Sequence, residues 1–167
     1  MDEKKIAAWY PVLFRTALRL TGSVTDAADL TQQAFCRAIE HWDSFQHNCS
    51  PLTWMYRILV NGMKDWSRRE TTRRAAPLDE WAPLIEDPDG PGVPETAARN
   101  EQLMILRKAI GALAQPMRQA FVATVLDGYS YREAAELLGV PVGTVASRVN
   151  AARTELSQTM RQRFPEA

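Results

Sequence analysis

Residues 129–153 constrain the fold more than any other part of this chain, because they hold two helical patterns separated by helix-ending residues. Ser130 and Glu133 have the spacing of a capping box, in which each side chain accepts a hydrogen bond from the other residue's backbone amide. Gly139 suits the left-handed position that ends a helix, and Pro141 suits the first residue of a new one. The stretch therefore predicts two helices joined by a tight turn.

The second of these helices has two different faces. One face is apolar at helical spacing and is expected to point inward: Val145, Val149, Ala152 and Leu156. The opposite face is small and polar with one long cation: Thr144, Ser147, Arg148 and Ala151. Such a face suits a helix that lies in the major groove of DNA. A helical hairpin whose outer face is only solvated has the same pattern, so the pattern alone leaves both interpretations open.

Composition is that of an ordered globular protein, since 46% of the 167 residues are hydrophobic and 24% are charged. No apolar run approaches the roughly 20 residues that span a bilayer, and the first residues lack the apolar core of a signal peptide. Cys36 and Cys49 provide no disulfide framework, in agreement with a reducing compartment. We therefore expect a cytoplasmic protein without direct membrane insertion.

The middle of the chain is rich in proline, glycine and acidic residues. Five prolines and two glycines lie between residues 75 and 98, a composition that does not support a long helix or strand. The net charge is −4 over residues 71–98, +1 over residues 1–70 and +3 over residues 99–167, so a neutral total conceals a basic C-terminal third. We expect an all-α protein in which a flexible acidic linker, 73–98, joins two small helical domains, 1–72 and 99–167. A long surface loop within one domain is the alternative.

The N-terminal part is predicted to form three helices, over about 11–20, 25–42 and 51–69, with Ser50 and Pro51 as the N-cap and first residue of the third. The second helix is expected to bury Ala28, Phe35, Ile39 and Trp42. Its other side is polar: Asp29, Gln32, Gln33, Cys36, Arg37 and Glu40. In the C-terminal part, helices over about 100–113 and 115–126 are expected to precede the hairpin.

The third helix interleaves aromatic and basic residues with an amide: Trp54, Arg57, Asn61, Lys64, Trp66, Arg68 and Arg69. Aromatic rings can stack on bases while cations follow the phosphates, as in proteins that bind single-stranded nucleic acid. The preceding loop, 45–50, carries an aromatic ring, amides and an imidazole that could hold an unstacked base. Taken singly, each residue is more often part of a core or of a solvated helix end, and only the combination indicates this function.

No pattern in the sequence supports catalysis or metal binding. The candidate metal ligands are Cys36, His41, His47 and Cys49, and their spacing matches no zinc-binding pattern. Glycine-rich phosphate loops, nucleophile elbows and metalloprotease motifs are absent from the sequence. We expect no catalytic residue, no cofactor and no small-molecule substrate.

Three segments of the sequence resemble those of a known protein family. Residues 26–45, DAADLTQQAFCRAIEHWDSF, and 50–69, SPLTWMYRILVNGMKDWSRR, resemble the core-binding domain of extracytoplasmic-function (ECF) sigma factors, in the sigma-70 family. Residues 128–153, GYSYREAAELLGVPVGTVASRVNAAR, resemble the C-terminal promoter-binding domain of these factors. The resemblance implies a bacterial transcription initiation factor that binds core RNA polymerase, at the β′ clamp helices and the β flap, and directs it to promoters. Members of the family are usually held inactive by an anti-sigma factor, often bound to the membrane, and we expect one here.

The resemblance also implies roles for individual residues. The clamp helices would contact Asp26, Asp29, Gln32, Gln33, Arg37 and Glu40. The −10 element would be captured and melted by Phe45, Gln46, His47, Asn48, Trp54 and Asn61, with its backbone held by Arg57, Lys64 and Arg68. The −35 duplex would be contacted by Thr144, Ser147, Arg148, Asn150, Ala151 and Arg153. The acidic linker would lie in the channel through which RNA leaves.

The sequence departs from the family pattern at three positions. Gln33 takes the place of a usual glutamate, and alanines at 146 and 151 take the place of common basic residues. Because phosphate contacts supply much of the affinity for DNA, the strength and sequence preference of −35 binding stay open.

Two other functions remain as alternatives. A free-standing helix-turn-helix regulator that binds operator DNA as a dimer explains the C-terminal third equally well, although it leaves the polar side of the second helix and the aromatic-basic third helix unexplained. A metal- or redox-sensing enzyme would require a reactive Cys36 or Cys49, and no neighbouring residue in the sequence indicates one.

Overall fold

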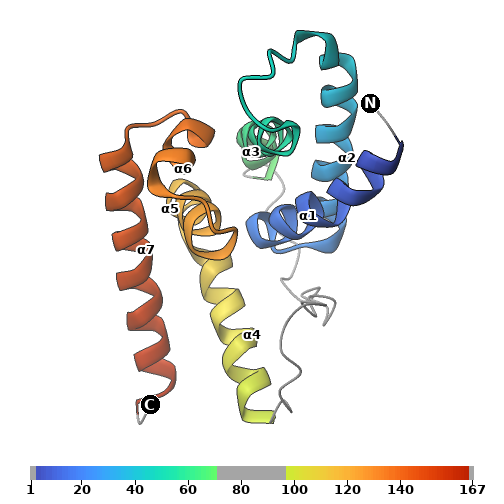
Figure 1. The fold of residues 1–167 in the computed structure, drawn as a ribbon. Coiled ribbons are helices and arrows are strands. Elements are labelled where there is room, and N and C mark those ends of the chain that lie inside the picture. The colour runs from blue at the N-terminus through green and yellow to red at the C-terminus, as the bar shows by residue number, and fades with distance from the viewer. Residues whose placement is uncertain (1–2, 71–96, 166–167) are drawn as a thin grey trace.

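A computed structural model describes residues 3–70 and 97–165, and every regular element in these two ranges is helical (Figure 1). The expected all-α fold is thereby confirmed. The predicted linker, 73–98, lies outside the described residues apart from Ala97 and Ala98, which already belong to a helix. The first range contains α1 (Glu3–Thr21), α2 (Val24–Glu40), the 3₁₀ turn η1 (Trp42–Ser44) and α3 (Pro51–Glu70). The second contains α4 (Ala97–Ala112), α5 (Gln115–Phe121), the π-helical η2 (Val122–Leu126), α6 (Tyr131–Leu138) and α7 (Val142–Arg163).

Helices α1, α2 and α3 form the N-terminal unit. Helix α1 begins at Glu3, earlier than predicted, and contains Pro11 in its interior. A proline removes one backbone hydrogen bond from a helix but does not always end it, which is why the predicted start was wrong. Gly22, with φ of +74°, ends α1, and the Ser23 side chain accepts a hydrogen bond of 3.2 Å from the Asp26 amide to begin α2. Ser50 caps α3 as predicted, accepting from the Thr53 amide at 3.0 Å.

The buried face of α2 differs from the predicted one. Phe35 is buried as expected, but Ile39 is 55% exposed and Trp42 lies beyond the end of the helix, in η1. The residues that α2 buries are mostly small: Ala27, Leu30, Thr31, Ala34, Phe35 and Ala38. Small side chains let neighbouring helices approach closely, and a Cβ built on Gly62 of α3 would lie 3.2 Å from Leu30 Cδ1. The prediction was therefore wrong for Ile39, which lies on the exposed side of the helix, whereas the predicted Ala28 is half-buried.

Helices α4 to α7 form the C-terminal unit. Both hydrogen bonds of the predicted capping box are present, from the Ser130 amide to Glu133 Oε2 at 2.8 Å and from the Glu133 amide to Ser130 Oγ at 3.3 Å. Gly139 has the predicted left-handed backbone, with φ of +65°. Pro141 is the N-cap of α7 and not its first helical residue, so the helix starts one position later than predicted. The local signals of the hairpin thus predicted its geometry to within one residue.

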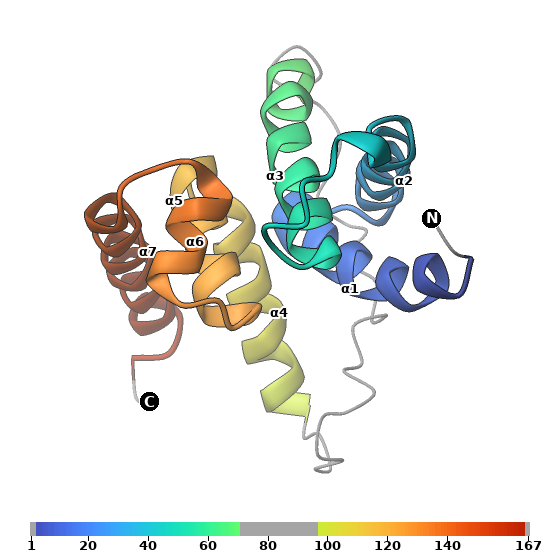
Figure 2. The ribbon, with the colours of Figure 1, turned by 45° about the horizontal axis from the view of Figure 1, so that its top comes forward.

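The two units pack against each other. One continuous hydrophobic core joins residues of α1 and α3, such as Leu13 and Leu59, to residues of the C-terminal unit, such as Val122, Ala134 and Leu137. A smaller cluster between α4, α5 and α7 includes Ile110, Phe121 and Leu156 and completes the C-terminal unit. Both views show α5 and α6 beside α1 and α3, with α7 on the far side of the C-terminal unit (Figures 1 and 2). The outer face of α7 is therefore directed away from the N-terminal unit.

Candidate functional site

The polar side of α2 is a continuous exposed surface. Its predicted members are exposed at Asp29, Gln32, Gln33 and Glu40, whereas Asp26 and Arg37 are half-buried. A shallow open hollow on this face is lined by Gln32, Gln33, Cys36, Arg37 and Glu40. The structure therefore brings the predicted set together on one helix, with carboxylates and amides directed to solvent.

The loop before α3 is built on an aromatic cluster. The Phe45 ring is only 5% exposed and lies 5.7 Å from the ring of Trp42, 5.1 Å from Trp54 and 4.5 Å from His47, measured between ring centroids. His47 has a left-handed backbone, with φ of +54°, which histidine tolerates better than most residues. Beyond this cluster Gln46, His47 and Asn48 are exposed. Phe45 thus lies beneath the loop, whereas the other predicted residues of the loop form its surface.

Trp42 is the residue of this region that sequence reasoning missed. It was predicted as a buried residue of the second helix, but it lies half-buried in η1 and contacts both Phe45 and Trp54. Its position three residues before Phe45 was the available signal, because a short turn brings such rings together. The edge-on contact between Trp42 and Trp54, with centroids 5.9 Å apart, connects the loop to the start of α3.

The predicted −10 residues of α3 follow one side of the helix. Arg57, Asn61, Lys64 and Arg68 recur at intervals of three or four positions, which places them on a common face. Asn61 is exposed, and Arg57 is half-buried with its Nε atom buried and without a hydrogen-bond partner among the described residues. The side chains of Lys64 and Arg68 lie outside the described part of the structure. The exposed amide of Asn61 thus lies one turn beyond the half-buried guanidinium of Arg57.

Helix α7 has the two faces that the sequence predicted. Its inward residues Val145, Val149 and Ala152 are fully buried and Leu156 is 6% exposed. The outward set divides into exposed residues and half-buried ones: Ser147, Asn150, Ala151 and Arg153 are exposed, and Thr144 and Arg148 are half-buried. The Ser147 hydroxyl donates to the Thr144 carbonyl at 3.0 Å, which leaves its oxygen able to accept a further hydrogen bond. The outer face is therefore shallow and open, as a helix in a DNA groove requires.

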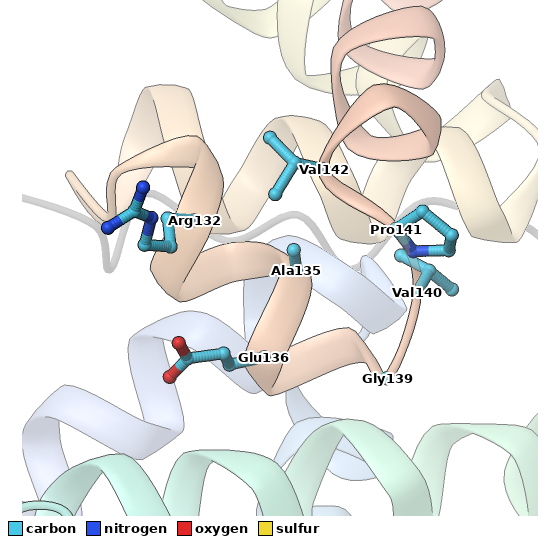
Figure 3. A pocket seen from close by; sticks show the side chains of 7 residues that line it. All are labelled: Arg132, Ala135, Glu136, Gly139, Val140, Pro141 and Val142. Carbon is cyan, nitrogen blue, oxygen red and sulfur yellow. The ribbon is translucent and has the colours of Figure 1, made fainter.

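A second hollow lies at the turn between α6 and α7, where sequence reasoning assigned no site. Figure 3 shows Arg132 and Glu136 extending from α6 on one side, and Val140, Pro141 and Val142 on the other. The Val142 side chain is 45% exposed at this rim. Nearby, the hydrogen bonds from Ser130 lower the pKa of the Glu133 carboxyl, so the carboxylate that caps α6 stays ionised at a lower pH than an ordinary glutamate does.

The described residues contain no group of three or more histidine, cysteine or acidic side chains close enough to hold a metal ion. Within the same residues no helix is both long enough and apolar enough to cross a bilayer.

Comparison with known proteins identifies the family. The family model for Sigma-70 region 2 matches residues 6–73, and the family model for Sigma-70, region 4, matches residues 103–156. The ECF RNA polymerase sigma factor EcfG of Rhodopseudomonas palustris is 34% identical over 157 residues, which cover 91% of this chain and 81% of the relative. This chain belongs to the ECF RNA polymerase sigma factors. The sigma factor is also 35% identical to the sigma-E factor of Escherichia coli over 77% of this chain and 70% of the relative.

Solved structures similar to this sigma factor include a sigma factor bound to its anti-sigma factor. The sigma factor RpoE of Bartonella quintana, crystallised with the anti-sigma factor NepR, superposes with a TM-score of 0.72 and 25% identity, over 95% of this chain and 96% of that one. CnrH, in complex with the cytosolic domain of CnrY, gives a TM-score of 0.66 and 28% identity over 95% and 87% of the two chains. Both similarities include the N-terminal and the C-terminal unit.

Family membership establishes the general function. Like other members, this sigma factor directs RNA polymerase to promoters, and the family is not a family of enzymes. A free-standing helix-turn-helix regulator is not favoured, because the match to region 2 covers the N-terminal unit that such a regulator leaves unexplained. The predicted clamp-helix and −10 residues fall within the region 2 match, and the predicted −35 residues fall within the region 4 match.

Proposed function

We propose that the polar side of α2 binds the clamp helices of the polymerase β′ subunit. The observation that carries this proposal is the exposure of Asp29, Gln32, Gln33 and Glu40 on one helix. The last three of these residues also line an open hollow. Asp29 and Gln32 have no side-chain partner among the described residues, so both are free to bond with another protein. In the same complex the C-terminal unit would contact the β flap.

The −10 element is proposed to be opened and held by the loop before α3. Gln46, His47 and Asn48, with Asn61 of α3, would hydrogen-bond the edges of unstacked bases, and Arg57, Lys64 and Arg68 would follow the phosphates. Phe45 is buried, so its role in this proposal is to support the loop, together with Trp54 and Trp42. A pre-formed loop loses less conformational freedom when a base enters it than a disordered one would.

The −35 element is proposed to bind the outer face of α7 through its major groove. Ser147, Asn150 and Arg153 are exposed, and Arg148 presents a long cation between them. Thr144 and Ala151 complete the face with side chains small enough to let the helix backbone approach the bases. The linker, 73–98, would follow the RNA exit channel between the two DNA-binding units.

The proposed partner that controls this factor is an anti-sigma protein. RpoE of Bartonella quintana was solved with the anti-sigma factor NepR, and CnrH was solved with the cytosolic domain of CnrY. Both resemble this chain over nearly its full length. An anti-sigma protein attached to the membrane would also hold this factor there.

Run-off transcription with purified core polymerase and a library of genomic promoters tests the proposal as a whole. We expect new transcripts that require this chain and that share one −10 and one −35 sequence. Core polymerase alone and the chain with Asp29→Ala and Gln32→Ala serve as controls, and both are expected to lack these transcripts. An absence of transcripts together with an absence of affinity for core would contradict the proposal.

A further inference from the structure

Asp127 connects the two units of this sigma factor. It follows η2 in the C-terminal unit, yet its side chain, 9% exposed, is directed into the N-terminal unit. One carboxylate oxygen accepts hydrogen bonds from the Thr16 hydroxyl at 3.0 Å and the Tyr56 hydroxyl at 2.8 Å, while the other forms an ion pair with the Arg19 guanidinium. All three donors belong to α1 or α3. The carboxylate is thus fully engaged by the opposite unit.

Further contacts surround this network. Arg19 also donates to the Leu126 carbonyl at 3.3 Å, and the Tyr56 ring meets the Tyr129 ring edge-on with centroids 5.0 Å apart. Burial, with Asp127 as a further cause, holds the pKa of the Tyr56 phenol well above its ordinary value, so the hydroxyl stays protonated and able to donate. A separate bond joins Gln115 Nε2 to the Met63 carbonyl at 3.1 Å.

The covalent chain does not force the two units to touch. The segment between Glu70 and Ala97 could span about 90 Å if fully extended. The closed arrangement in Figures 1 and 2 therefore depends on the contacts across the interface. The shared apolar core stabilises the contact between the two units but does not by itself favour one relative orientation. The Asp127 network provides the directional part, because the buried Asp127 carboxylate is stable only in the arrangement that pairs it with the half-buried Arg19 guanidinium.

We propose that Asp127 is a latch that holds the two units closed in the free sigma factor, and that binding of core polymerase, and through it of the promoter, requires this latch to open. The −10 loop and α7 must reach two DNA elements that are separated along the promoter, whereas the latch holds them on one compact body. The conformational part of the inference concerns the chain alone. The functional part, that opening admits polymerase and promoter, rests on the proposed function.

Single-molecule energy transfer on the free chain tests the conformational part. Dyes are attached to cysteines introduced by Thr25→Cys in α2 and Ser157→Cys in α7, two exposed positions outside the proposed interfaces, after Cys36→Ser and Cys49→Ser. The labelled chain that keeps Asp127 should show a predominantly short distance between the two dyes. Asp127→Ala should raise the separated fraction about tenfold, because the closed state would lose the Thr16, Arg19 and Tyr56 hydrogen bonds to the carboxylate and would leave the half-buried Arg19 guanidinium without its counter-ion.

Matched variants make the test specific. Glu136→Ala removes an exposed carboxylate from the same unit and should leave the distance unchanged. Asp127→Asn keeps the shape of the side chain and should raise the separated fraction less than Asp127→Ala does. It takes the place of Asp127→Ala in the test if circular dichroism shows that Asp127→Ala does not fold. Arg19→Ala combined with Asp127→Ala should open the chain no more than Asp127→Ala alone. An unchanged distance in both folded Asp127 variants, or a predominantly open chain without substitution, would overturn the latch.

Core-polymerase titrations with the same variants test the functional part. If opening precedes binding, the unlatched variants should bind core up to about tenfold more tightly, because a larger fraction of molecules is competent. Variants that open but bind core with unchanged affinity would overturn the functional part. A chain that fails to bind core in any form would refute the proposed function, and the energy-transfer result would still decide the latch.

Discussion

At the scale of single residues, Tyr56 makes a prediction about stability at high pH. The pKa of its phenol is raised in the folded protein, by burial first and by Asp127 second. The unfolded phenol ionises above about pH 10 while the folded one does not, so the stability that Tyr56 contributes is present below that pH and is lost as the pH rises. The free energy of unfolding should therefore fall above about pH 10, by at most about 1.4 kcal/mol per pH unit from this group.

Urea denaturation between about pH 9 and pH 11 measures this effect. The difference between the unsubstituted chain and Tyr56→Phe isolates the contribution of the phenol, since other groups titrate in both. Tyr10→Phe, at a ring that is 40% exposed, is the matched control. Parallel pH curves for the unsubstituted chain and Tyr56→Phe would show that the phenol is not held neutral by the fold.

Arg148 makes a second prediction at this scale. It is half-buried on the outer face of α7, beside two alanines at positions where the family often has cations. We expect it to hold a phosphate, so Arg148→Ala should weaken −35 binding equally for all sequences and reduce the salt slope by about one. If it reads a base instead, the loss should be about 1–3 kcal/mol at one promoter position.

Promoter binding over a salt series distinguishes these two roles. Arg161→Ala, at an exposed position near the end of the same helix, is the control and should bind as the unsubstituted chain does. Ala151→Arg should strengthen binding without changing sequence preference, because position 151 is exposed. Wild-type affinity of Arg148→Ala at every salt concentration would remove this helix from the DNA interface.

At the scale of elements, the polar side of α2 is predicted to be an interface and not a structural surface. Asp29→Ala combined with Gln32→Ala should weaken binding to core polymerase while changing the free energy of unfolding by only about 0.5 kcal/mol, since both side chains are exposed. Glu101→Ala with Gln102→Ala removes an equally exposed acid and amide from α4 and should leave core binding unchanged. Equal affinity of both double variants for core would refute the interface.

The loop before α3 is predicted to act during promoter melting. Asn61→Ala should impair formation of the open complex on duplex promoters more than it impairs closed-complex binding, because an amide that reads a base edge has no target until the base leaves the stack. Permanganate footprinting of unpaired thymines measures the open complex directly. Asn100→Ala, an exposed asparagine on α4, is the control. Normal thymine reactivity with Asn61→Ala would count against this role.

At the scale of the whole molecule, the continuous core across both units predicts cooperative unfolding. The chain should lose its helical circular dichroism in one denaturant transition, because each unit loses the part of the core that it shares with the other when that other unit unfolds. Asp127→Ala should broaden this transition or split it into two, whereas Glu136→Ala should not. Two separate transitions in the unsubstituted chain would mean that the units are energetically independent.

Features that depend on neighbours three or four residues apart could be predicted from the amino-acid sequence alone. The capping box of Ser130 and Glu133, the left-handed Gly139 and the cap of α3 by Ser50 are all of this kind. The buried stripe of α7 was also predictable, because its spacing follows from helix geometry alone. The same regularity placed the candidate residues of α2 and α7 on shared faces.

Which of several possible contacts each face makes depends on the packing of elements that are distant in the sequence. Phe45 is buried because it packs against Trp42 of η1 and Trp54 of α3, whereas Ile39 is exposed, and helical spacing does not contain that information. The closure of the two units is the largest such decision. Thr16 and Asp127 are 111 positions apart, and their hydrogen bond forms only after two cores have met across an interface that no local pattern encodes.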